Sequence, residues 1–231
     1  MPISCLVFDL DDTLYPANGL WEEIGKRIAR FMIERLDISP VEVDDRRQKY
    51  FHDYGTTLRG LMTDFPGVDA DDYLAYVHDV DLARWIAPNP ALAAMLAALP
   101  QPKAIFTNSD AAHTGRVLNC IGVAQHFDAI VDIRAMGFEN KPLPRSYEIL
   151  LERIETPAGE CVLIDDLVRN LLPARELGMT TILVGDGLAP DAAIDYRVGT
   201  ILETETIIRK LPLGPGAPKG TTRQDAKDAK S

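Results

Sequence analysis

The sequence has few basic residues and no long apolar run. Only 24 of its 231 residues are Lys or Arg, against 35 Asp or Glu, so the formal net charge is -11. Nucleic acids and anionic membranes bind basic surfaces, and this balance therefore argues against either as the main partner. A segment of about twenty apolar residues, which could cross a membrane, is also missing. Since no signal peptide is recognisable either, we expect a cytoplasmic protein.

Cysteine and histidine are scarce, with three and four residues. The cysteines lie in apolar stretches, their number is odd and no CxxC spacing occurs, which predicts buried, reduced thiols. These thiols are Cys5, Cys120 and Cys161. Three histidines show no metal-ligand spacing and are interpreted as packed or surface residues; they are His52, His78 and His126. The sequence therefore predicts neither a disulfide-rich fold nor a zinc site.

The chain divides into three parts by composition and periodicity. Residues 1–14 and 86–211 show strands alternating with helices, which predicts an α/β fold with a parallel, Rossmann-like sheet. Residues 15–85 show helical periodicity and no convincing strand, and we expect an all-helical insertion after the first strand. Residues 212–231 are rich in Pro, Gly and Lys and are predicted to form a disordered tail.

The expected elements follow from apolar spacing and from capping signals. The strands are expected at 5–8, 103–107, 129–133, 161–164 and 180–184, and the helices of the α/β part at 90–99, 111–121, 146–154 and 171–177. In the insertion, helices are expected at 20–32, from 40 towards 50, at 56–65 and at 71–80. Ser39-Pro40-Val41-Glu42 resembles a capping box that opens the second of these helices. Asn170 is expected to cap the helix that contains Pro173.

The most informative feature is the acidic run that ends the first strand. Cys5 to Phe8 is apolar and reads as a buried parallel strand, and Asp9, Asp11 and Asp12 follow it directly. Burying a charge costs several kcal/mol unless it is paired or bound to a metal. Doubly wound folds bind their ligands at the carboxyl ends of such strands, so this run is predicted to face a substrate.

Three further strand ends carry polar residues that suit the same chemistry. Thr107 and Asn108 close one strand, Lys141-Pro142 follows the next, and Asp165-Asp166 closes another. Parallel strands bring these ends to one crevice. There a carboxylate can attack phosphorus, Mg²⁺ can neutralise repelling anions, and Lys and Thr can hold phosphoryl oxygens. A second carboxylic acid can protonate the leaving oxygen and then activate water.

This ordered set resembles the haloacid dehalogenase-like hydrolase superfamily. Asp9-Leu10-Asp11-Asp12-Thr13 is similar to its first motif, Thr107-Asn108 to the second, Lys141-Pro142 to the third and Asp165-Asp166 to the fourth. The resemblance implies a Rossmann-like fold and a phosphatase that works through an aspartyl-phosphate. An acid at position 11 favours phosphatase over dehalogenase, because carbon–halogen cleavage leaves no oxygen to protonate.

The resemblance also implies a role for each residue. Asp9 would be the nucleophile and Asp11 the general acid and base. Mg²⁺ would be bound by the Asp9 carboxylate, the Asp11 backbone carbonyl and Asp166, while Asp165 would act through water or orient its neighbours. Thr107, Asn108 and Lys141 would hold the phosphoryl group.

A narrower resemblance points to the pyrimidine 5′-nucleotidase branch. It rests on Leu14-Tyr15, on the stretch from Tyr54 to Leu61, and on Phe106 to Asp110 followed by His113. The insertion would then be a cap over the substrate, with Tyr54 and Arg59 as its candidate contacts, while His113 would approach the substrate from the α/β part. One departure is Leu167, where the branch usually has Ser. Trp21 and Trp85 are interpreted as packing residues near the ends of the cap.

The sequence thus predicts a Mg²⁺-dependent phosphomonoesterase acting on a small phosphate ester, with pyrimidine nucleoside monophosphates as the first candidates. A phosphatase for a sugar phosphate or another metabolite is the alternative within the same class. A non-catalytic relative that binds phosphate ligands or a protein is the alternative from another class. The oligomeric state is not predicted.

Overall fold

A computed structural model describes residues 1–186 and 193–214 of the chain. Its strands are β1 (Cys5–Phe8), β2 (Lys103–Phe106), β3 (Ala129–Val131), β4 (Cys161–Asp165), β5 (Thr180–Val184) and β6 (Tyr196–Val198). Its α-helices are α1 (Leu20–Leu36), α2 (Val43–Tyr54), α3 (Thr57–Asp64), α4 (Ala70–Val77), α5 (Pro90–Ala98), α6 (Ala111–Ile121), α7 (Pro144–Ile154), α8 (Val168–Glu176) and α9 (Thr204–Ile208).

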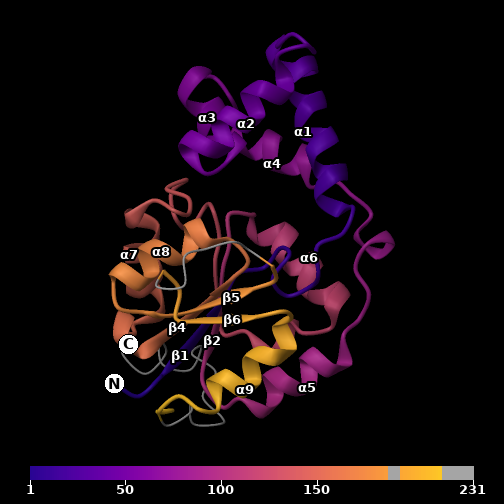
Figure 1. Cartoon of the computed structure of the whole chain (residues 1–231). Helices are drawn as coiled ribbons and strands as arrows, with labels where there is room; N and C mark the ends of the chain where they lie inside the picture. Colours follow the sequence, from indigo (N-terminus) through magenta and orange to yellow (C-terminus); the bar gives the residue numbers. More distant parts are fainter. Residues whose placement is uncertain (187–192, 215–231) are drawn as a thin grey trace, which may run out of the picture.

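The strands of the described residues form one parallel sheet with the order β3-β2-β1-β4-β5-β6. Helices α7 and α8 lie on one side of the sheet, and α5, α6 and α9 lie on the other (Figure 1). Every residue of β1, β2 and β4 is buried, as expected for strands that are covered on both faces. The predicted Rossmann-like α/β fold is confirmed, and β1 lies at its centre.

The chain leaves the sheet after β1 and forms α1 to α4 before it returns through α5 to β2. These four helices lie together at one end of the molecule, above the sheet (Figure 1), and we call residues 20–77 the helical insertion. Helix α3 begins where the Thr56 side chain accepts a hydrogen bond from the Arg59 N–H. The predicted all-helical insertion after the first strand is confirmed.

The two segments that connect the insertion to the sheet lie against each other. The Asn18 side-chain amide donates a hydrogen bond to the Trp85 carbonyl oxygen, at 3.0 Å. A Cβ atom on Gly19 would lie only 2.3 Å from the Trp85 ring, so glycine is required for this close approach. Trp85 therefore packs at the boundary of the insertion, as its sequence position suggested.

Two predicted helix starts are wrong. Ser39 to Glu42 forms a turn, in which the Glu42 N–H donates to the Ser39 carbonyl oxygen, and α2 begins only at Val43. Asn170 does not cap α8, which already begins at Val168 with Pro173 in its interior. The Asn170 side chain instead binds Asp165, so a tertiary contact takes the place of the expected cap.

The C-terminal part of the described chain differs from the prediction in two places. Strand β6 adds an edge to the sheet beside β5 and was not predicted. Residues 212–214 do not belong to a disordered tail, because Leu213 pairs with Ile3 and the Gly214 N–H donates to the Ile3 carbonyl oxygen. Residues 215–231 of the predicted tail lie outside the described residues. None of the described helices is both long and apolar enough to cross a lipid bilayer.

Candidate active site

The candidate site lies where the strand order reverses, at the carboxyl ends of β1 and β4. The chain runs from β1 to β2 and β3 on one side and then returns to β4 on the other, which opens a crevice between β1 and β4. Asp9 follows β1, and Asp165 ends β4. The sheet therefore brings these two distant carboxylates to one point.

Lys141 joins these two carboxylates. Its Nζ lies 2.7 Å from Asp9 Oδ1 and 2.8 Å from Asp165 Oδ2, and the residue is only 1% exposed. Its ammonium group also lies 5.1 Å from the centre of the Phe106 ring. Burial alone lowers the pKa of Lys141, but the charges of Asp165 and Asp9 outweigh this and raise it. The lysine is therefore charged and fixed in position.

Asp165 and Asp166 have different surroundings. Asp165 accepts hydrogen bonds from the Asn170 amide, at 3.0 and 3.1 Å, and from the Leu167 N–H, at 2.8 Å, in addition to Lys141. Asp166 accepts from the Thr13 hydroxyl at 3.3 Å, and the same hydroxyl lies 3.3 Å from Asp9. Since Asp165 already has several donors, the oxygens of Asp166 and Asp9 are the more available ones.

Asp11 is held by two hydroxyl donors. The Tyr15 hydroxyl donates to it at 2.6 Å and the Ser109 hydroxyl at 2.8 Å, while His113 Nε2 lies 3.5 Å away. Burial raises the pKa of Asp11, but His113, Tyr15 and Ser109 outweigh this effect, and the pKa is lowered overall. His113 thus touches Asp11, and it also stacks on His78 at 4.2 Å.

Thr107 and Asn108 lie beside this cluster at the end of β2. The Thr107 hydroxyl oxygen accepts a hydrogen bond from the Ser109 N–H at 3.0 Å. Asn108 accepts from the Lys141 N–H at 2.8 Å and donates to the Lys141 carbonyl oxygen at 3.1 Å. Asn108 therefore fixes the backbone that presents Lys141, a role that the sequence did not reveal.

The cluster holds more negative charge than Lys141 can balance. Burial raises the pKa of Asp9 well above its usual range, and the charges of Asp165 and Asp166 raise it further. Burial and the charge of Asp165 raise the pKa of Asp166 to about 7. In the same way, burial and Asp11 raise the pKa of Asp12 to about 6, and one buried oxygen of Asp12 has no hydrogen-bond partner in the described chain.

These residues fit a hard divalent cation. Asp9, Asp165 and Asp166 each offer a carboxylate oxygen, and the three oxygens lie within 4.8 Å of one another. Oxygen donors and surplus negative charge are what Mg²⁺ requires, and a bound cation favours the ionised carboxylates. The donor set contains no nitrogen or sulfur, which distinguishes it from a zinc site.

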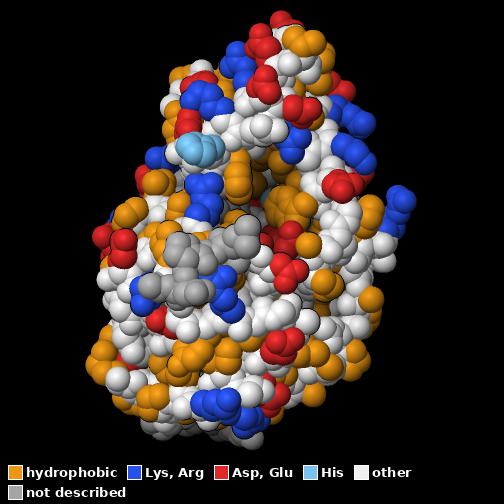
Figure 2. Space-filling view, viewed as in Figure 1, with side chains coloured by type: hydrophobic (Ala, Val, Ile, Leu, Met, Phe, Trp, Pro, Cys, Tyr) orange, Lys and Arg blue, Asp and Glu red, His pale blue; other side chains and the backbone are white. Residues whose placement is uncertain are grey.

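A cavity of about 610 Å³ lies between this cluster and the helical insertion. Asp9, Asp11, Thr107, Asn108 and Lys141 line its lower side. The insertion supplies an apolar wall, made of Trp21, Ile24, Ile28, Phe51, Leu58, Leu74 and Val77. Figure 2 shows this hollow, with hydrophobic side chains inside it and acidic ones at its lower edge. Asp44, Arg47 and Gln48 of the insertion line the cavity as well. The cavity thus joins an acidic floor to a largely apolar wall with one ion pair, which suits a charged group carried on an organic body.

The insertion touches the floor of the cavity at Gly55. This residue ends α2 with a φ of +85°, and a Cβ atom there would lie 2.5 Å from the Lys141 carbonyl oxygen. The Asn140 side chain donates to the neighbouring Tyr54 carbonyl oxygen at 2.8 Å. Only glycine fits this left-handed position at such close range, so Gly55 sets how near the insertion comes to Lys141.

The sequence matches the haloacid dehalogenase-like hydrolase family over residues 3–178. This match covers well over half of the chain. The protein belongs to that family.

Similar proteins include two that are named as phosphatases and one that is named as a dehalogenase. A "glyceraldehyde 3-phosphate phosphatase" of Methanopyrus kandleri is 28% identical over 90% of this chain and 98% of the relative. The solved structure of a HAD phosphatase from Thermococcus onnurineus has a TM-score of 0.60 at 18% identity and covers 92% of this chain and 100% of that one. The L-2-haloacid dehalogenase of Xanthobacter autotrophicus has a TM-score of 0.59 at 18% identity over 90% and 99%. The two structures show that the hydrolase fold extends over the insertion as well.

Three predicted substrate contacts of this hydrolase do not line the cavity, namely Tyr54, Arg59 and His113. The His113 ring lies beside Asp11 instead. Arg59 donates to the Phe138 carbonyl oxygen at 3.1 Å and to Glu139 at 3.2 Å, so it fastens α3 to the segment before Lys141. Arg169 acts similarly from α8, donating to the Phe51 and His52 carbonyl oxygens. Sequence order does not reveal which side of a helix faces the cavity, and a substrate contact of Tyr54 on α2 or of Arg59 on α3 stays a prediction.

Arg59→Ala is therefore expected to lower kcat/KM by a similar factor for small and large phosphate esters. The variant loses one hydrogen bond and one partly exposed ion pair between α3 and the segment before Lys141. This weakens the contact that positions Lys141 by about 1 kcal/mol, so the reactive arrangement is populated roughly fivefold less. Rates for an aryl phosphate and a nucleoside monophosphate measure this, with the exposed Arg30→Ala on α1 as the control. A loss confined to the larger ester would restore Arg59 as a substrate contact.

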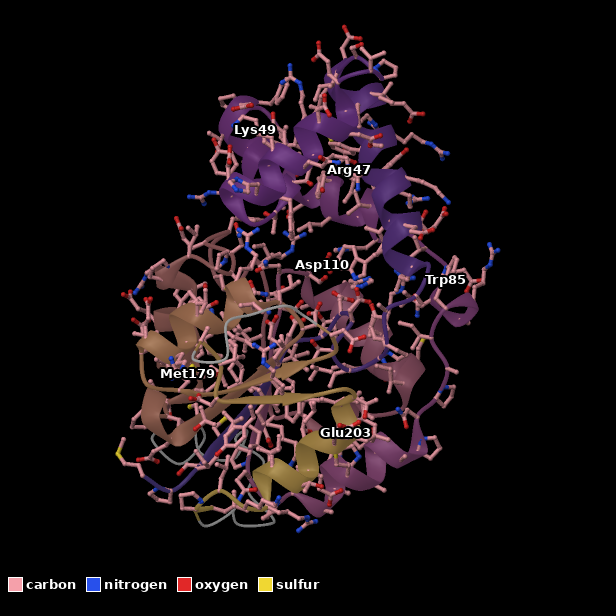
Figure 3. The ribbon with its side chains drawn as sticks, viewed as in Figure 1. Arg47, Lys49, Trp85, Asp110, Met179 and Glu203 are labelled. Carbon is pink, nitrogen blue, oxygen red and sulfur yellow. The ribbon has the colours of Figure 1, made fainter. Side chains whose placement is uncertain are left out.

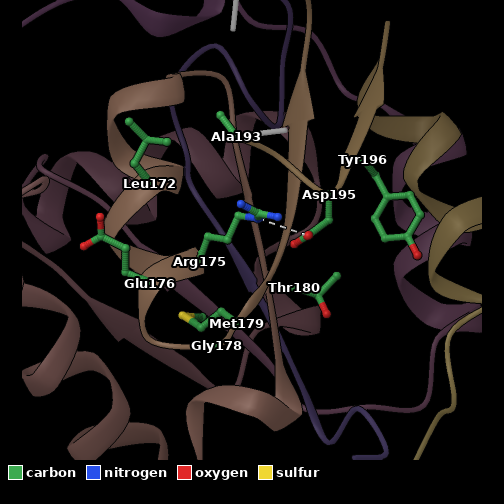
Figure 4. A pocket seen from close by; sticks show the side chains of 9 residues that line it. All are labelled: Leu172, Arg175, Glu176, Gly178, Met179, Thr180, Ala193, Asp195 and Tyr196. Carbon is green, nitrogen blue, oxygen red and sulfur yellow. Dashed lines mark hydrogen bonds and ion pairs between the residues drawn. The ribbon is translucent and has the colours of Figure 1, made fainter. Parts of the chain in front are cut away.

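A second hollow of about 570 Å³ lies at the other edge of the sheet, near the amino ends of β5 and β6 (Figure 4). Its cationic side chain, Arg175, is bound to Asp195 at 3.2 Å. The carboxylate cluster lies at the carboxyl ends of the strands instead. We therefore place the candidate active site of this hydrolase in the first cavity.

Proposed function

We propose that this hydrolase is a phosphomonoesterase that transfers a phosphoryl group first to Asp9 and then to water, with Mg²⁺ as its cofactor. The observation that carries this proposal is the pairing of Asp9 with the buried Lys141 inside a cluster of carboxylates. A carboxylate that is buried, paired and open to a cavity is suited to act as a nucleophile. The phosphatase relative described above supports the same reaction class.

In the first half-reaction, the phosphoryl group is transferred to Asp9. Asp9 attacks phosphorus with its carboxylate while the bond to the leaving oxygen breaks. Lys141 and the Thr107 hydroxyl hold the phosphoryl oxygens, and Asn108 keeps Lys141 in place. Because these donors are fixed before the substrate arrives, they stabilise the developing charge without reorganising.

Asp11 moves the proton in both half-reactions. In the free protein it is ionised, because Tyr15 and Ser109 donate to it. A dianionic phosphate brought beside it favours its protonated form, which then donates the proton to the leaving oxygen. The resulting carboxylate accepts a proton from the water that hydrolyses the phosphoaspartate.

Asp9 and Asp166 would hold Mg²⁺, together with the Asp11 backbone carbonyl. When bound, the ion would offset the repulsion between the acidic cluster and the phosphate. Asp165 would support the site by fixing Lys141, because its oxygens already accept hydrogen bonds from three residues.

Asp166→Asn is expected to raise the Mg²⁺ concentration for half-maximal activity more than Asp165→Asn does. We expect this concentration to rise about a hundredfold when the direct ligand Asp166 is changed and about tenfold when the supporting Asp165 is changed. Asp165→Asn is the more destabilising of the two, because it removes a partner of the buried Lys141. Metal titrations and melting curves of both variants test this, and the reverse order in metal requirement would exchange the two roles.

We further propose that residues 15–85 form a cap that selects the substrate, while the core at 1–14 and 86–211 performs the chemistry. The sequence resemblance favours a pyrimidine nucleoside 5′-monophosphate. The name of the Methanopyrus kandleri relative favours a small sugar phosphate instead. The insertion supplies one wall of the cavity. This wall would contact the part of the ester that distinguishes these candidates.

Phosphate release from an aryl phosphate, with Mg²⁺ and with a chelator, tests the reaction class. Metal-dependent release is expected, followed by a ranking of nucleotides and sugar phosphates by kcat/KM. A non-catalytic relative would bind these esters without releasing phosphate, and that result would refute the proposed function.

A further inference from the structure

Arg47 is a cavity residue that the proposed chemistry does not use. It lies on α2 and lines the cavity from the side of the insertion. Figure 3 shows it within the helical insertion, above Asp110 of the α/β part. Among the described residues that line the cavity, only Arg47 and Lys141 carry a full positive charge, and Lys141 is bound to Asp9 and Asp165.

The guanidinium group of Arg47 lacks adequate partners. Its Nε–H is buried and has no hydrogen-bond acceptor in the described part of the chain. Its Nη1 lies 3.4 Å from Asp44, whose side chain is 83% exposed, so this ion pair is long and screened by solvent. Buried donors in native proteins almost always have a partner, and a group bound in the adjoining cavity would supply one here.

Helix α1 leaves room for this guanidinium. Gly25 lies inside the helix, where glycine costs about 1 kcal/mol relative to alanine. A Cβ atom on Gly25 would lie 2.7 Å from Arg47 Nη2. Glycine therefore allows the cation to lie against the helix, at the edge of the apolar wall formed by Ile24 and Ile28.

An anion is the ligand that this arrangement would recognise. The planar guanidinium offers parallel N–H donors that match the two oxygens of a carboxylate or phosphate. The apolar wall lowers the local dielectric and strengthens such a pair. The reacting phosphate is already assigned to Lys141 and Thr107, so Arg47 faces the other end of the substrate.

We propose that Arg47 selects phosphate esters whose leaving group carries a second anionic oxyacid group, either a carboxylate or another phosphate. This inference rests on the proposed phosphatase function, because it concerns the alcohol that leaves phosphorus. Among esters that fit the cavity, those with an anionic end are preferred over neutral esters of the same shape.

Two esters of similar shape test the proposal: 4-carboxyphenyl phosphate and 4-carbamoylphenyl phosphate. With the full-length protein and Mg²⁺, we expect kcat/KM to favour the carboxylate at least about tenfold. In Arg47→Gln this ratio falls to near one, and in Arg47→Lys it is intermediate, because charge remains while the fork is lost. A third ester, 1,4-phenylene bisphosphate, shows whether carboxylate or phosphate is the preferred anion.

Arg46→Gln is the matched control. Arg46 precedes Arg47 on the same helix, binds Glu42 and does not line the cavity. It should keep the wild-type ratio. A ratio near one in the wild type, or the same loss of ratio in Arg46→Gln, would overturn the proposal. An equal loss of both esters in Arg47→Gln would also overturn it, since Arg47 would then support the fold or the reacting phosphate.

Binding separates this inference from the proposed reaction. Asp9→Asn removes the nucleophile, so calorimetry on this variant measures affinity for both esters without turnover. We expect Asp9→Asn to bind the carboxylate ester more tightly than the amide ester, and we expect the double variant Asp9→Asn/Arg47→Gln to bind both equally. This result supports the role of Arg47 even if the wild type hydrolyses no phosphate ester. Equal binding of both esters refutes it, even if the protein proves to be a phosphatase.

Discussion

Asp9→Asn should lower turnover of every phosphate ester by about 10⁴-fold or more, the scale seen when enzymes lose a nucleophile. An amide cannot form the acyl phosphate and is a poorer ligand for a hard cation. The fold should remain intact, because Lys141 keeps Asp165 as a partner at 2.8 Å. Phosphate release and melting temperature, measured on the same preparation, test both parts of this expectation.

The control for this variant is Asp12→Asn in the same loop. Asp12 has a φ of +57°, a conformation that asparagine also adopts, and one of its oxygens has no partner among the described residues. We expect this variant to retain activity within about tenfold of the wild type, as for a residue outside the reaction. Activity of Asp9→Asn in the same range would rule out Asp9 as the nucleophile.

Lys141→Met should have the largest effect on stability. It leaves Asp9 and Asp165 buried without their shared cation, which costs about 3–5 kcal/mol. For a protein of this size, that lowers the melting temperature by roughly 6–20 °C. Activity should fall by about 10²-fold or more, because the fixed donor to the phosphoryl oxygens is lost as well.

A double variant tests the cause of this instability. Adding Asp165→Asn to Lys141→Met removes one of the unpaired charges and should recover part of the lost stability. The exposed Lys49→Met, which loses an ion pair to Asp53, should change the melting temperature little. If Lys141→Met melts within about 2 °C of the wild type, the buried ion pairs contribute little and the argument fails.

The acidic cluster was predictable because a short stretch of sequence, an apolar strand followed directly by carboxylates, is enough to recognise each of its parts. Asp9 and Asp165 each follow a run of buried apolar residues, and a parallel sheet brings such strand ends together. Lys141 was found in the same way, from its place after the third strand. The roles of these residues remain predictions, while their proximity is a structural finding.

Contacts made across elements were not predictable in this way. Asn170 was assigned to a helix cap because Asn is common there, but its amide binds Asp165 instead. Arg47 belongs to a charged stretch that, by its composition, resembles a solvated helix face. Its place in the cavity depends on how α2 packs against Gly25 of α1, which no local pattern encodes.

Since Asn18 and Gly19 meet Trp85, the two segments that connect the helical insertion to the sheet come together at one place on the α/β part. A short linker could therefore join the two connecting segments in place of the insertion, and the conformational entropy lost on closing so short a loop is small. Another segment could replace the helical insertion and its connection to Trp85 without rerouting the sheet, as insertions are best tolerated where chain ends lie close together. In evolutionary terms, the connection makes the insertion a separable module, and under the proposed cap function new specificities could arise by its exchange while the carboxylate cluster stays unchanged.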